Sequence, residues 1–120
     1  MVKELKEYRQ WAWNCFRDSM CKHVFTWHLK SADYDDICPP LARYKFDCYS
    51  AQGKRGELAR GLIEGEIEWS DKLLEVIYND PICGACSYSC GRVIDMQPSD
   101  VIQSLRAQAI KDGKTPPGGF

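Results

Sequence analysis

The residues with the clearest chemistry are seven cysteines, three of which lie close together in the sequence. Cys83 and Cys86 are separated by two residues, and Cys90 follows after three more. Thiolates at this spacing are typical ligands of metal ions and inorganic clusters, because one tight loop can bring them to a common centre. An odd number of cysteines cannot all pair in disulfides. We therefore expect the cysteines to bind a metal or a cluster.

The spacing of these three cysteines matches the last three positions of the C-x2-C-x2-C-x3-C run of bacterial ferredoxins. Asp80 stands where the first cysteine of that run belongs, and Gly91 replaces the proline that follows it. Asp80 is therefore a candidate oxygen ligand to iron. Two alternatives are a plain turn before Pro81 and a three-iron cluster that needs no fourth ligand. Zinc also binds C-x2-C pairs, but a second such pair is missing, which favours iron and sulfide.

The other four cysteines have no standard spacing, yet two clusters would use every thiol. We expect one cluster on Cys15, Cys21, Cys48 and Cys90. We expect the other on Cys38, Cys83 and Cys86, with Asp80 as a further candidate ligand. One cluster on Cys38, Cys83, Cys86 and Cys90 is the alternative. The expected cofactors are two 4Fe–4S clusters, of which one could be 3Fe–4S.

Apolar residues at helical spacing predict the elements that must position these ligands. We expect a mainly α fold with helices over residues 3–19, 55–64, 71–78 and 100–111. Ser70 and Ser99 are expected to cap the last two helices, and Gly113 lies just past the end. Pro39 and Pro40 are expected to break any helix within the irregular stretch 20–50. The cysteines would then lie on loops between helices.

Length and charge narrow the class of protein further. The 120 residues suit one domain, which we expect over residues 1–114, with residues 115–120 as a flexible C-terminal tail. Sixteen basic and seventeen acidic residues give a net charge of −1, which argues against nucleic-acid binding by bulk charge. No stretch approaches the ~20 apolar residues of a transmembrane helix. The first residues do not resemble a secretory signal, so we expect a cytoplasmic protein.

From Cys38 to about Pro116, the sequence resembles the iron–sulfur subunits of the glycolate oxidase and heterodisulfide reductase D type. The shared features are the Cys38-Pro39 dipeptide, the segments 50–54 and 58–65, the C-x2-C of 83–86, and the Leu-Arg-Ala of 105–107. Gln52 stands where the family has arginine, Asp80 and Gly91 replace a cysteine and a proline, and Cys48 is additional.

The resemblance implies a small helical ferredoxin-like domain with cysteine-bearing loops around its clusters. It implies a non-catalytic electron-transfer subunit of an oxidoreductase complex of anaerobic metabolism. Such a subunit relays electrons between a flavin-containing donor and a catalytic subunit, in the cytoplasm or attached to a membrane complex through its partners. Family members usually continue into cysteine-rich CCG domains, which residues 1–120 do not contain, so the resemblance implies the electron-relay module alone. The alternatives from the residues are a zinc-stabilised interaction module without a redox role and, more weakly, a thiol enzyme.

Overall fold

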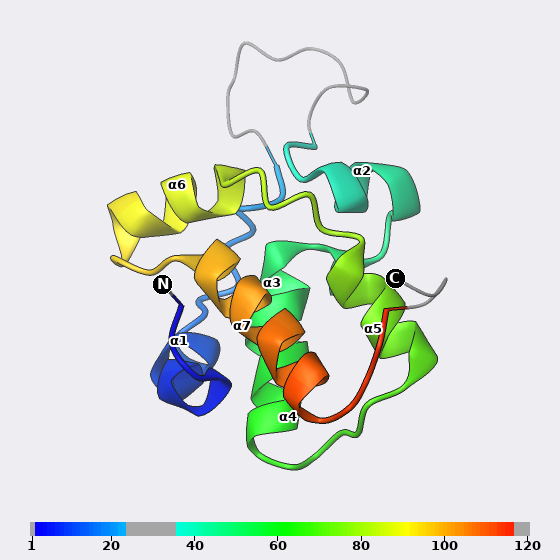
Figure 1. Ribbon diagram of the computed structural model, residues 1–120. Coiled ribbons are helices and arrows are strands. Elements are labelled where there is room, and N and C mark those ends of the chain that lie inside the picture. The colour runs from blue at the N-terminus through cyan, green and yellow to red at the C-terminus, as the bar shows by residue number, and fades with distance from the viewer. Residues whose placement is uncertain (1, 24–35, 117–120) are drawn as a thin grey trace, which may run out of the picture.

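The computed structural model describes residues 2–23 and 36–116 (Figure 1). Within them, one isolated antiparallel bridge is the sole strand-like pairing, so the expected mainly α fold is confirmed. The elements in chain order are η1 (Leu5–Tyr8), α1 (Arg9–Trp13), α2 (Pro39–Tyr44), η3 (Asp47–Tyr49), α3 (Ala51–Gly53), η4 (Lys54–Ala59), α4 (Arg60–Ile63), α5 (Asp71–Tyr78), α6 (Ala85–Val93) and α7 (Pro98–Lys111).

The central helix is made of α3, η4 and α4, which follow one another without a break. It begins after Ser50, whose hydroxyl accepts a hydrogen bond from the N–H of Gly53 at 3.1 Å. Its middle part, η4, is a π-helical stretch, a widened form of helix that is frequent at functional sites. The helix therefore has a firmly capped amino end and an irregular turn directly behind it.

Helix α7 joins the main core to the region of the cysteines. Its Val101 and Leu105 pack in the core with residues of η1, η4 and α5. Its Ile102 instead packs with Cys21 and Ala51. All three α7 side chains are fully buried. In Figure 1, α7 lies in front of the central helix, with α6 at one end of it.

The bridge between His23 and Asp36 brings two distant cysteines together. The N–H of Ile37 donates to the carbonyl of Lys22 at 2.8 Å, and His23 Nδ1 lies 2.9 Å from Asp36 Oδ1. Cys21 and Cys38 each lie two residues from the bridged pair. The backbone pairing therefore places these two cysteines on neighbouring chain segments.

Two expectations for the first half of the chain are wrong. The helix expected over residues 3–19 ends at Trp13, and Arg17 and Ser19 then adopt positive φ angles of 58° and 66°. Pro39 and Pro40 begin α2 instead of breaking a helix. Proline lacks an N–H that the first helical turn does not need, and its fixed φ suits that turn.

The second half contains a helix that the sequence analysis missed. Helix α6 carries Cys86 and Cys90, so these cysteines do not lie on a loop. Ser99 does not cap α7; its N–H donates to the Ser87 hydroxyl at 3.0 Å, and Gln97 precedes the helix. Ser70 does cap α5, as expected.

The carboxyl-terminal region was expected to end with Gly113 and a tail, and no membrane span was expected. Gly113 follows α7 with a φ of 75°, as expected for a residue just past a helix end. Residues 117–120 of the expected tail lie outside the described residues. In the described part of the chain, every helix is too short or too polar to cross a membrane.

The close approach of η3 to the central helix makes a specific demand at Gly53. A Cβ atom there would lie 2.2 Å from the carbonyl oxygen of Asp47, which is backbone and cannot rotate away. We expect Gly53→Ala to lower the free energy of unfolding by about 1–3 kcal/mol. Gly56→Ala is the matched control, because its Cβ would meet Cys15 at an ordinary 3.4 Å. Urea unfolding of both variants measures the difference, and equal midpoints would contradict the predicted clash.

Candidate cysteine-lined site

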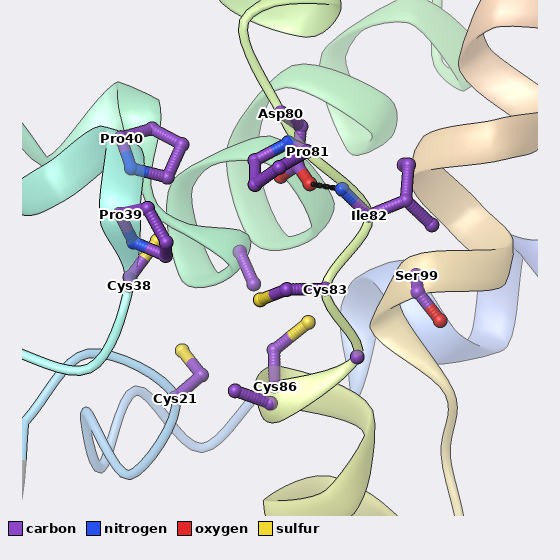
Figure 2. A pocket seen from close by; sticks show the side chains of 13 residues that line it. Cys21, Cys38, Pro39, Pro40, Asp80, Pro81, Ile82, Cys83, Cys86 and Ser99 are labelled. Atoms are coloured by element: carbon purple, nitrogen blue, oxygen red, sulfur yellow. Dashed lines mark hydrogen bonds between the residues drawn. The ribbon is translucent and has the colours of Figure 1, made fainter.

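Four cysteines from three separate segments line one pocket between α2, the start of the central helix, α6 and α7. They are Cys21, Cys38, Cys83 and Cys86. Figure 2 shows them around one opening, with Cys83 and Cys86 on one side and Cys21 and Cys38 on the other. The pocket encloses about 320 Å³, including space that opens to solvent. Four thiols around one opening are the ligand number that a 4Fe–4S cluster requires.

Backbone N–H groups point at the sulfur atoms of this pocket. The N–H of Gln52 donates to the Cys21 sulfur, and the N–H of Ala51 donates to that of Cys38. Both donors belong to the first turn of the central helix, whose N–H groups have no carbonyl partners within the helix. The helix end therefore provides hydrogen bonds that stabilise negative charge on sulfur.

Burial favours the protonated form of three of the pocket thiols in the metal-free protein, those of Cys21, Cys38 and Cys86. It raises the pKa of Cys21 to about 12 and that of Cys86 to about 11. It also raises the pKa of Cys38 above its usual value. Only thiolates bind metal, so metal binding in this pocket has to release the thiol protons. The attraction of the metal for the thiolates must therefore offset the cost of burying negative charge.

Asp80 also lines the pocket, but its two carboxylate oxygens are already engaged. Oδ2 lies 2.9 Å from the ammonium of Lys54, and Oδ1 accepts a hydrogen bond from the N–H of Ile82 at 2.7 Å. Lys54 is completely buried. The structure therefore places the expected oxygen ligand in an ion pair beside the thiols.

A second pocket adjoins the first and contains fewer thiols. Cys15 and Cys90 line it, and Cys21 lines both pockets. Its other notable member is Arg55, which is 2% exposed and donates from Nη1 to the Cys90 sulfur at 3.5 Å. The Nε atom of Arg55 is buried without a hydrogen-bond partner among the described residues. A buried guanidinium of this kind favours negative charge nearby.

Gln52 connects this second pocket to the irregular segment that carries Cys15 and Cys21. Its side-chain oxygen accepts a hydrogen bond from the N–H of Ser19 at 3.2 Å. Its own N–H donates to Cys21, as described above. Gln52 is therefore a positioning residue for the segment between Cys15 and Cys21.

The arrangement differs from the expected ligand sets in two respects. Cys21 shares the second pocket with its expected partners Cys15 and Cys90, but it also lines the first pocket with Cys38, Cys83 and Cys86. Cys48 lines neither pocket; burial raises the pKa of its thiol, which the charges of Lys72 and Lys54 lower and that of Asp47 raises. All seven cysteines are free thiols. Within residues 2–23 and 36–116, no three His, Cys, Asp or Glu side chains gather closely enough to bind a single metal ion.

Lys54 and Arg55 are site residues that the cysteine spacing does not indicate, although the sequence contains a signal for them. Both follow the amino end of a helix, where the helix dipole disfavours cations. Both are nevertheless buried there. Two adjacent basic residues at such a position indicate polar partners in the folded chain, in this case a carboxylate for Lys54 and the sulfur of Cys90 for Arg55.

Comparison with known proteins identifies no relative. The chain matches no protein-family model, no curated protein and no solved structure. The resemblance described above therefore remains an expectation from the residues alone.

The different burial of the four pocket thiols predicts an order of chemical reactivity. Cys83 is exposed, whereas Cys21 is buried and its pKa is about 12. We expect iodoacetamide to modify Cys83 first in the metal-free protein and Cys21 last. Raising the pH from 7 to 9 should leave Cys21 slow, because its thiol stays protonated until the pH approaches 12. Mass spectrometry of timed digests measures the order, with urea-unfolded protein as the control in which the difference disappears.

Proposed function

We propose that this chain is an electron-transfer protein that binds a 4Fe–4S cluster through Cys21, Cys38, Cys83 and Cys86. The observation that carries the proposal is the convergence of these four thiols, from three separate chain segments, on one pocket. A bound cluster supplies reversible one-electron oxidation and reduction. The protein supplies the thiolates, the backbone N–H donors and the buried cations that favour the cluster's negative charge.

The same four thiols are also a possible zinc site, and the spacing of the side chains favours the larger cofactor. A zinc ion holds four sulfurs at about 2.3 Å from one point. The described residues offer no group already gathered around a single ion. A cluster core is wider and accepts thiolates that lie farther apart. The zinc-stabilised interaction module is therefore the second candidate.

A second cluster would use the adjoining pocket. Cys15 and Cys90 are available there, Cys21 lies between the two pockets, and Arg55 would compensate negative charge. Cys48 would have to move to complete a four-thiol set. The iron content separates the alternatives: about eight iron atoms per chain correspond to two cubanes, about seven to one cubane and a 3Fe–4S centre, and about four to the first pocket alone.

An electron relay also needs a route to its partners. Cys83 is the exposed member of the four proposed ligands, so the side of the first pocket that carries it is the side nearest the protein surface. We propose that this edge faces a redox partner, such as a flavin-containing donor or the catalytic subunit of a cytoplasmic oxidoreductase complex. The resemblance to iron–sulfur subunits of that type supports the same role and a ferredoxin-like function for the domain.

The test is anaerobic reconstitution with iron and sulfide, followed by analysis of iron, sulfide and zinc per chain. We expect broad visible absorption and an EPR signal after reduction with dithionite. Cys21→Ser, Cys38→Ser, Cys83→Ser and Cys86→Ser should each lose at least half of the iron at the first pocket. Cys48→Ser is the matched control and should keep it.

Two results would contradict the proposal. Stoichiometric zinc without iron in protein purified under nitrogen would favour the interaction module. Equal loss of iron in Cys48→Ser and in the four pocket variants would show that the pocket does not define the ligands.

A further inference from the structure

Lys54 and Asp80 form an ion pair inside the protein, directly beside the first pocket. The Nζ and Oδ2 atoms are 2.9 Å apart, and the side chains are 0% and 10% exposed. Removing two charges from water costs more than their attraction commonly returns, so a buried pair is a poor device for stability alone. Its position calls for another explanation.

The loop around Asp80 is held in place from several directions. The N–H of Ile82 donates to Asp80 Oδ1, and the guanidinium of Arg106 donates to the backbone carbonyls of Asp80 and Ile77. Ile82 has a φ of 54°, an unusual conformation for a β-branched residue. The carboxylate is therefore fixed toward Lys54 by its surroundings as well as by charge.

The two charges of the pair act on the pocket thiols with opposite signs. Lys54 favours the thiolate of Cys38, whose pKa it lowers, while Asp80 disfavours the same thiolate. Asp80 also raises the pKa of Cys86. Burial of both partners limits screening by water and salt, so each charge acts on the pocket more strongly than an exposed charge would.

We infer that the Lys54–Asp80 pair is a fixed charge element that sets the reduction potential of the cluster held by the four thiols. In this role Asp80 acts through its charge and its contact with Lys54, and it is not a ligand to iron. Cys21 supplies the fourth ligand that a ferredoxin run would place at position 80. The inference rests on the proposed function, because it requires a cluster in the first pocket.

Single substitutions of the pair shift the potential in opposite directions. Lys54→Met removes a positive charge, which makes addition of an electron less favourable and lowers the potential. Asp80→Asn removes a negative charge at almost constant shape and raises it. Each change alters the one-electron equilibrium constant by roughly tenfold, equivalent to about 59 mV. The double variant returns close to the wild-type potential, because the pair is neutral overall.

The experiment is an EPR-monitored redox titration of the reconstituted full chain, with iron analysis of each variant. Lys54→Arg, which keeps the charge, should keep the potential. The control pair is Lys111 and Glu4, an exposed ion pair. Lys111→Met and Glu4→Gln should leave the potential unchanged. If Lys54→Met does not fold, the near-isosteric Asp80→Asn still gives the sign of the shift.

The outcomes separate this inference from the proposed function. Wild-type protein without a cluster would overturn the proposed function before the pair is tested. If the wild-type protein binds a cluster but both single variants shift its potential in the same direction, or neither shifts it, the inference alone is overturned. Loss of one iron atom per chain in Asp80→Asn would also overturn it, because that result identifies Asp80 as a ligand.

Discussion

Two basic side chains are buried just inside the amino end of the central helix, where the helix dipole already adds positive charge. This arrangement is costly unless negative charge lies close by. Asp80 provides it for Lys54, and the sulfur of Cys90 lies against Arg55. These two contacts fix the neighbouring segments, because the Asp80 loop contacts Lys54 and helix α6 contacts Arg55.

The thiols are brought together by three different kinds of local structure. Cys21 and Cys38 lie on the two chain segments joined by the antiparallel bridge between His23 and Asp36. Cys86 belongs to α6, and Cys83 precedes this helix by way of Gly84, whose φ of 84° turns the chain sharply. Because the segments are separate, each thiol position depends on the packing between them. Binding of a cluster by all four thiols would join these segments covalently through iron, so folding and cofactor binding are expected to be coupled.

Helix α7 connects this region to the rest of the protein. Its buried residues contact the main core on one side and the apolar wall of the pocket on the other. Ile102 packs with Cys21, and Ser99 contacts Ser87 of α6 through its N–H and its hydroxyl. Disturbance of the core is therefore transmitted to the pocket through one rigid helix, because close-packed side chains leave little room for independent adjustment.

The sequence by itself determined the helical class, the Ser70 cap and the Cys83–Cys86 pair, because these features depend on periodicity and spacing within a few residues. It misjudged the prolines of α2, since proline both breaks helices and begins them. The grouping of Cys21 with Cys38 was decided by tertiary structure, through a bridge between residues far apart in the chain. Tertiary structure likewise turned Asp80 toward Lys54, because only the folded chain removes both charges from water and places them in contact with each other.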